Sequence, residues 1–168
     1  MGIFYKSQRI GKGGKSFLLY KFRTMIKGAD KVGPESTSGD DKRITRIGRI
    51  LRKFKIDELP QLWNVLKGDM SLVGPRPEVA SVMELMHKQF PEEYDIIISV
   101  KPGITDLASL WDFNEEEKLA GEKDPHKAYL EKIWPEKRRL QIEYIKNKSF
   151  WLDIKIIFLT IKKILFRR

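Results

Sequence analysis

The sequence has no cysteine among its 168 residues. This absence excludes a disulfide framework, a thiolate metal site and a cysteine nucleophile. Histidine is scarce as well, since His87 and His126 each stand alone, without a second histidine at metal-ligand spacing. A lone histidine is most often a surface or packing residue, so we assign neither of them a role.

A long uncharged apolar run is also missing. The most apolar segment, residues 150–168, contains cations throughout, and its longest uncharged run is only Ile156–Ile161. A spanning helix needs about 20 apolar residues, and the N-terminus has no signal-peptide pattern. The sequence therefore predicts a soluble or peripheral protein in a reducing compartment.

Positive charge is in excess, with a net charge of +10, and it is unevenly distributed. Residues 1–56 carry 15 basic and 4 acidic side chains, residues 57–145 carry 11 and 18, and residues 146–168 carry 7 and 1. Two basic ends thus flank an acidic middle. This asymmetry suggests contact with a polyanion, either nucleic acid, a phosphorylated ligand or an anionic membrane. Charge alone is equally compatible with a well-solvated basic surface.

The predicted fold class is α+β: a single helix-rich domain with a small β-hairpin and amphipathic surface helices. Hydrophobic residues make up 41% of the chain, which is enough for a core. Strands Phe4–Ile10 and Ser16–Met25, with glycines between them, predict the hairpin. Residues 27–42 are rich in glycine and small polar residues and predict a mobile loop. Helices are predicted over residues 43–54, 57–68, 78–90, 135–148 and 150–168.

Two of these helices are amphipathic. In helix 43–54 one arc carries Ile44, Ile47, Ile50, Leu51 and Phe54, and the opposite arc carries Arg46, Arg49, Arg52 and Lys53. Most such helices pack the apolar arc on the core and leave the polar arc in water, but this basic arc could also face phosphates or lipid headgroups. Helix 150–168 fits equally a membrane interface or a core-packed position.

Asp57 and Glu58 begin the next helix, with Asp57 at its predicted N-cap. Helix N-termini favour anions, and two carboxylates there could bind a divalent metal through oxygen ligands. One of them could instead act as a nucleophile. An aspartate in this position is more often only a cap.

Arg76 lies between Pro75 and Pro77 in a segment that cannot be helical. A rigid backbone reduces the entropy that is lost when a long side chain is ordered, and arginine suits bidentate phosphate contacts. A surface arginine on a turn is the alternative.

Several segments, in this order, resemble the bacterial sugar transferases, or monotopic phosphoglycosyl transferases. The resemblance covers nearly the whole chain, and its most specific part runs from Asp57 to Pro77. The matching segments are Phe4–Gly11, Lys21–Met25, Ile44–Lys53, Asp57–Ser71, Gly74–Pro77 and Lys101–Thr105.

The resemblance implies that residues 1–168 form the catalytic domain of an enzyme that transfers a sugar-1-phosphate from a UDP-sugar to a polyprenyl phosphate, in bacteria usually undecaprenyl phosphate. Asp57 would attack the β-phosphorus, UMP would leave, and the polyprenyl phosphate would then take the phosphosugar from Asp57. Mg²⁺ is the implied cofactor, with Asp57 and Glu58 as its ligands; Glu58 could also serve as a proton acceptor. Arg76 with Pro75 and Pro77, and secondly Arg52, are expected to hold the donor.

The resemblance also implies a place at the cytoplasmic face of the bacterial inner membrane, on an anionic lipid surface, at the start of surface glycan assembly. Family members carry a hydrophobic membrane segment immediately before the region that matches Phe4, and we expect this chain to lack it. After Thr105 many members continue with Gly and then Ala-Gln, whereas this chain has Asp106–Ser109. This difference is expected to mark a subgroup with a different sugar.

Two other functions compete with the enzyme. Nucleic-acid binding fits the basic ends, but the sequence has no helix-turn-helix, zinc-finger or RNA-binding aromatic motif, and we predict no nucleic-acid partner. A catalytically inactive membrane-surface adaptor of the same fold is the main alternative. The sequence leaves open a homo-oligomer and the identity of the sugar.

Overall fold

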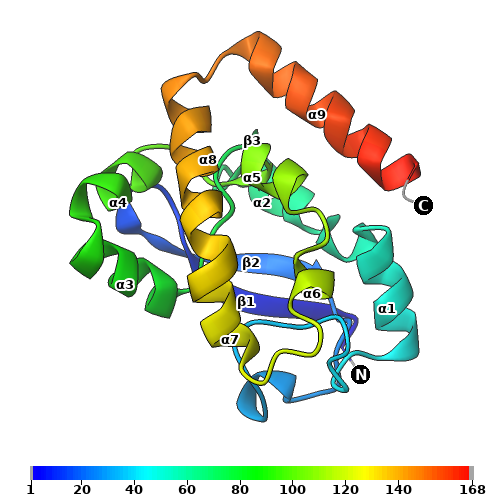
Figure 1. The fold of residues 1–168 in the computed structure, drawn as a ribbon. Helices are drawn as coiled ribbons and strands as arrows, with labels where there is room; N and C mark the ends of the chain where they lie inside the picture. Colours follow the sequence, from blue (N-terminus) through cyan, green and yellow to red (C-terminus); the bar gives the residue numbers. More distant parts are fainter. Residues whose placement is uncertain (1, 167–168) are drawn as a thin grey trace.

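A computed structural model describes residues 2–166 and confirms the α+β class. The hairpin of β1 and β2 lies at the centre of the view in Figure 1, and the helices surround it. The elements are β1 (Phe4–Ile10), β2 (Ser16–Phe22), α1 (Arg46–Lys53), α2 (Gln61–Leu66), β3 (Ser71–Val73), α3 (Ala80–Gln89), α4 (Pro91–Ile98), β4 (Gly103–Thr105), α5 (Leu107–Trp111), α6 (Glu115–Lys118), α7 (Pro125–Ala128), α8 (Trp134–Lys146) and α9 (Phe150–Leu165).

The predicted hairpin is confirmed. Strands β1 and β2 pair antiparallel, from Phe4 opposite Phe22 to Ile10 opposite Ser16. Gly13 and Gly14 have φ angles of 67° and 72°, a left-handed conformation that glycine adopts without strain. The second strand ends at Phe22, earlier than predicted, because Met25 forms an isolated bridge with Ile44 instead.

A second small sheet pairs two of the motifs that lie far apart in the sequence. Strands β3 and β4 run parallel, with Ser71 opposite Gly103 and Val73 opposite Thr105. The two chains approach closely, since a Cβ atom on Gly103 would lie 2.1 Å from the backbone nitrogen of Gly74. Glycine at both positions therefore lets the backbone just before Arg76 pack directly on the Lys101–Thr105 turn.

The main core lies between α3, α4 and α8. Its buried residues are Val82, Met83, Met86, Ile97, Leu119, Ala128, Tyr129, Ile133 and Trp134. A second cluster of Val73, Tyr144 and Ile156 attaches α9 to α8 and β3. The acidic segment 113–128 contains α6 and α7.

Helix α1 begins at Arg46, three residues later than predicted, because the side chain of Thr45 caps it by accepting a hydrogen bond from the Gly48 N–H. Most of its apolar arc does not reach the core: Ile47 is 72% exposed, and Ile50 and Phe54 are also exposed. The reason is that the helix packs through Gly48, where a Cβ atom would lie 2.0 Å from the Thr24 carbonyl oxygen. Figure 1 shows α1 at the edge of the molecule.

The exposed apolar residues gather on α1, the turn after it, α2 and α9. They include Ile47, Ile50, Phe54, Leu59, Leu62, Trp63, Leu66, Phe150, Trp151, Ile154, Phe158, Ile161, Leu165 and Phe166. Helix α9 is amphipathic, as predicted; Arg167 and Arg168 of the predicted helix lie outside the described residues. Within residues 2–166 we find no helix with the length and apolar character needed to cross a bilayer.

Candidate active site

Most of the predicted site residues line one cavity of about 830 Å³. Its walls come from the hairpin, from residues 29–37, from the turn that contains Asp57, from the segment after Gly74, from α5 and α6, and from α9. Asp57, Glu58, Arg52, Arg76 and Pro77 all line it. Pro75 does not, because it is fully buried and its carbonyl accepts a hydrogen bond from the Gly103 N–H.

The predicted loop 27–42 forms part of the cavity wall. Its segment after Gly28 makes a short 3₁₀ turn, Ala29–Lys31. Arg43 braces this segment by donating to the carbonyl oxygens of Ala29 at 2.7 Å and Pro34 at 3.0 Å. The mobility of residues 27–42 stays a prediction.

Asp57 and Glu58 lie in a 3₁₀ turn, Ile56–Glu58, and not at the start of a helix. The expectation that Asp57 is an N-cap is therefore wrong, since α2 begins only at Gln61 with Pro60 at its N-cap. Lys55, the only described non-glycine residue with a positive φ (54°), redirects the chain just before the turn. The result is that both carboxylates point inward, 7% and 8% exposed.

Glu58 accepts hydrogen bonds from two cations. Its Oε1 lies 3.0 Å from Lys21 Nζ and 2.5 Å from Arg76 Nη2, and its Oε2 lies 3.2 Å from Arg76 Nη1. Burial alone would raise the pKa of Glu58, but the charges of Arg76 and Lys21 outweigh it and hold the pKa well below the usual range. Glu58 is therefore ionised at neutral pH.

Asp57 has a different environment. Its Oδ1 is buried and has no hydrogen-bond partner among the described residues. Burial raises the pKa of Asp57, attraction to Lys21 opposes this, and repulsion from Glu58 adds to it. Two adjacent carboxylates thus have opposite pKa shifts, an arrangement typical of sites that assign different roles to chemically similar groups.

Arg52 reaches the cavity from the inward side of α1. Its Nε donates to Thr24 Oγ1 at 2.8 Å, and its Nη1 donates to Glu116 Oε1 at 2.7 Å. The basic arc of the helix is therefore divided: Arg46, Arg49 and Lys53 stay exposed, and Arg52 alone lines the cavity.

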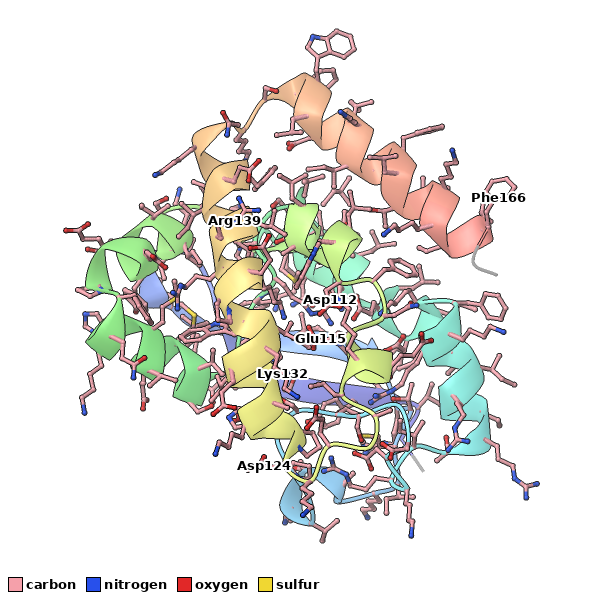
Figure 2. The ribbon with its side chains drawn as sticks, in the orientation of Figure 1. Asp112, Glu115, Asp124, Lys132, Arg139 and Phe166 are labelled. Atoms are coloured by element: carbon pink, nitrogen blue, oxygen red, sulfur yellow. The ribbon has the colours of Figure 1, made fainter. Side chains whose placement is uncertain are left out.

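Sequence reasoning missed a second cluster in the same cavity. Lys137 of α8, only 4% exposed, lies 3.0 Å from Glu115 Oε2, 3.2 Å from Glu78 Oε1 and 3.0 Å from the Tyr129 hydroxyl. Glu115 is the first residue of α6, and Figure 2 shows it beside α8. Glu78 was predicted to begin a helix, but α3 begins at Ala80, which leaves Glu78 in the non-helical segment after Arg76.

His126 also lies in the cavity wall, although nothing in the sequence pointed to a role for it. Its Nδ1 is 3.0 Å from Ser36 Oγ, so it connects α7 to the wall segment 29–37. Lys21 was missed in the same way, because a lysine in a β-strand is usually solvated.

The two carboxylates fit the predicted Mg²⁺ unequally. The free, buried Oδ1 of Asp57 is a suitable hard ligand, whereas both oxygens of Glu58 already accept from Arg76. Residues 2–166 contain no cluster of three or more Asp, Glu, His or Cys side chains arranged for a metal. This donor set suits a cation that is held by one carboxylate together with the phosphates of a substrate.

Comparison with known proteins shows similarity along the whole chain. Residues 1–167 match the sequence profile of the bacterial sugar transferases. The chain is 41% identical over 163 residues to the sugar transferase EpsL of Bacillus subtilis, covering 97% of this chain and 70% of that protein. It is 38% identical to the UDP-N-acetylgalactosamine-undecaprenyl-phosphate N-acetylgalactosaminephosphotransferase of Aeromonas hydrophila, and 41% identical to the UDP-glucose:undecaprenyl-phosphate glucose-1-phosphate transferase of Escherichia coli.

The chain spans only 35% and 32% of these last two proteins, while they cover 97% and 96% of it. The match to EpsL extends over more than two thirds of both proteins. Together with the match to the family profile, it shows that the chain belongs to the bacterial sugar transferase family.

Proposed function

We propose that the chain transfers a sugar-1-phosphate from a UDP-sugar to a polyprenyl phosphate, with Asp57 as the nucleophile. The observation that supports this most directly is the buried Oδ1 of Asp57, which has no hydrogen-bond partner among residues 2–166. Asp57 lies in a large cavity that Lys21, Arg52 and Arg76 also line. Relatives at 38–41% identity are named for transfer of a phosphosugar to undecaprenyl phosphate.

In the first step an Asp57 carboxylate oxygen attacks the β-phosphorus, and the bond between that phosphorus and the bridging oxygen of UMP breaks. UMP leaves with the bonding electron pair. In the second step an oxygen of the polyprenyl phosphate attacks the same phosphorus, and the bond to Asp57 breaks. The products are a polyprenyl-diphosphate sugar and a regenerated Asp57 carboxylate.

The main obstacle to this attack is repulsion between an anionic nucleophile and an anionic phosphoryl group. The cations around Asp57 reduce this repulsion. Arg76 and Lys21 place positive charge within the cavity, and Glu58 fixes both of them through hydrogen bonds. We assign Glu58 the role of holding these cations in position. Arg76 can then contact the diphosphate of the donor, with Arg52 as a second contact.

Mg²⁺ is part of this proposal, with Asp57 and the donor phosphates as its ligands. When bound, it would neutralise charge that develops on the phosphate oxygens. The residues of the chain would still bind the donor, orient it toward Asp57 and limit the access of water.

The acceptor would enter from a membrane. Several exposed apolar residues also line the cavity: Ile26, Leu59, Leu62, Leu72 and Ile161. An apolar rim around a cationic interior suits a ligand with a hydrocarbon tail and a phosphate head. We propose that this rim and the apolar residues of α1, α2 and α9 contact the cytoplasmic leaflet, whose anionic lipids attract the basic ends of the chain.

The test is release of UMP in detergent with undecaprenyl phosphate, MgCl₂ and a panel of UDP-sugars, for the wild type and Asp57→Asn. We expect release that requires Asp57, and a covalent phosphosugar adduct on the wild type when the acceptor is omitted. If the wild type binds liposomes but turns over no donor of the panel, the adaptor function replaces the enzyme.

A further inference from the structure

The second cluster in the cavity, Glu78, Glu115, Tyr129 and Lys137, is too polar and too deeply placed to be explained as surface charge. The Lys137 ammonium contacts Glu78, Glu115 and the Tyr129 hydroxyl. The Tyr129 hydroxyl in turn donates to Glu78 Oε1 at 2.9 Å. These contacts use one oxygen of each carboxylate. The other oxygen of each carboxylate can therefore accept a further hydrogen bond inside the cavity.

The position of this cluster relative to Asp57 is set by one short segment. Arg76 and Glu78 are two residues apart in the segment before α3 that is neither helix nor strand, and both line the cavity. Arg76 contacts Glu58, while Glu78 contacts Lys137. Two residues of chain span at most about 7 Å, so the two contacts lie close enough for one sugar phosphate to reach both.

The two ends of this segment differ in the ligand that they suit. Around Asp57 the cations Lys21, Arg52 and Arg76 favour phosphate. Beside Glu78 and Glu115 a phosphate would meet two carboxylates, whereas a hydroxyl group can donate to a carboxylate and accept from an ammonium or phenol. A neutral ligand with many hydroxyl groups is therefore the best match.

We propose that Glu78, Glu115, Tyr129 and Lys137 form the subsite that binds the hydroxyl groups of the donor's sugar and thereby selects the sugar. This inference rests on the proposed function. The sugar is joined directly to the phosphorus that Asp57 attacks, so its ring must lie in the same cavity, and the segment carrying Arg76 and Glu78 links Asp57's surroundings to this cluster. A site built to bind hydroxyl groups discriminates strongly, because an analogue that lacks the right hydroxyl leaves its buried groups unpaired.

The test compares Glu78→Gln and Glu115→Gln with the wild type, using the full chain in detergent. Each change keeps the shape of the side chain and removes its charge. The measured quantities are kcat/KM for UDP-glucose, UDP-galactose and their two N-acetyl derivatives, and the inhibition constant of UMP. The matched control is Glu143→Gln on the opposite, exposed part of α8, where Glu143 pairs with Arg139.

We expect the ratio of kcat/KM between the preferred donor and the others to change by about 10-fold or more in the Glu78 and Glu115 variants, with UMP inhibition unchanged within a factor of about two. The control should keep the wild-type ranking of donors. An equal loss for all four donors, or a parallel weakening of UMP inhibition, would overturn the subsite and assign the cluster to support of the fold or to the nucleotide. If Glu78→Gln shows no melting transition, Glu115→Gln decides the question, because Glu115 is more exposed.

Failure of the proposed function can be told apart from failure of this inference. If the wild type shows no turnover, calorimetric binding of UDP and of each UDP-sugar still tests the subsite. The subsite is supported if one UDP-sugar binds more tightly than UDP and this difference disappears in Glu78→Gln. Equal affinity for UDP and for every UDP-sugar of the panel would refute it.

Discussion

Arg76 and Glu58 form a two-pronged contact, in which Nη2 lies 2.5 Å from Oε1 and Nη1 lies 3.2 Å from Oε2. This geometry joins the turn that carries Asp57 to the segment between Pro75 and Pro77. Neighbouring charge from Glu58 raises the pKa of Arg76 well above its ordinary value, so both partners stay ionised.

The contact predicts that Arg76→Lys is not a conservative change, because a lysine cannot make two parallel hydrogen bonds. We expect kcat/KM for UMP release to fall by about 100-fold. The matched control, Arg139→Lys on the exposed face of α8, should retain wild-type activity.

Asp57→Asn tests the nucleophile. The change should lower UMP release by at least about 1000-fold, because an amide cannot attack the phosphorus. It should leave the melting temperature unchanged or raise it, because burial disfavours the charged form of Asp57 and the variant removes that charge. A variant that folds and keeps more than a tenth of wild-type activity would contradict the assignment.

The lowered pKa of Glu58 predicts how stability depends on pH. A carboxyl group whose pKa is lower in the folded state stabilises the fold above its unfolded pKa, about 4.3 for glutamate, and this contribution is lost as the pH falls through the folded value. Glu58→Gln should therefore be less stable than the wild type at pH 7, by about 2 kcal/mol, and this difference should shrink as the pH falls below about 4. Urea denaturation at pH 7, 5 and 3.5 measures it. A difference that is constant over this range would exclude the ion pair as its cause.

Ile156 anchors α9 to the body of the protein. Its side chain is fully buried against Val73 of β3 and Tyr144 of α8. Ile156→Ala should lower the free energy of unfolding by about 2–4 kcal/mol through lost burial and the cavity that remains, and it should reduce activity because α9 forms one wall of the cavity. Ile154→Ala, on the exposed face of the same helix, should change stability by less than about 0.5 kcal/mol. Equal effects of the two variants on the melting temperature would contradict this account of α9.

The sequence predicted the hairpin, the amphipathic α9 and the non-helical segment around Arg76, because these depend on local signals. Glycines between two apolar runs specify a turn, and prolines on both sides of Arg76 exclude a helix. Lys137 could not be found in this way. It lies in the first turn of an ordinary helical pattern, and only the packing of α8 near the segment 74–79 brings it to Glu78.

The position of Asp57 shows the same limit. Asp-Glu-Leu-Pro before an apolar pattern suggested an N-cap, but Lys55 adopts a left-handed conformation and the chain makes a 3₁₀ turn first. Sequence periodicity reports which side of a helix is apolar, and it does not report what that side contacts. Most helices with an apolar arc like that of residues 43–54 pack it on the core, whereas the structure leaves Ile47 and Ile50 exposed.

Gly48 sets the distance between α1 and the cavity. Its missing side chain allows the helix to touch the backbone at Thr24, where a Cβ atom would lie 2.0 Å from the carbonyl oxygen. A methyl group there would push the helix outward by more than an ångström, and Arg52, one turn further along, would move with it and lose its 2.8 Å contact with Thr24. A glycine on the surface helix thus acts as a spacer of minimal thickness, and the reach of Arg52, the proposed second phosphate contact, depends on a residue that has no functional group of its own.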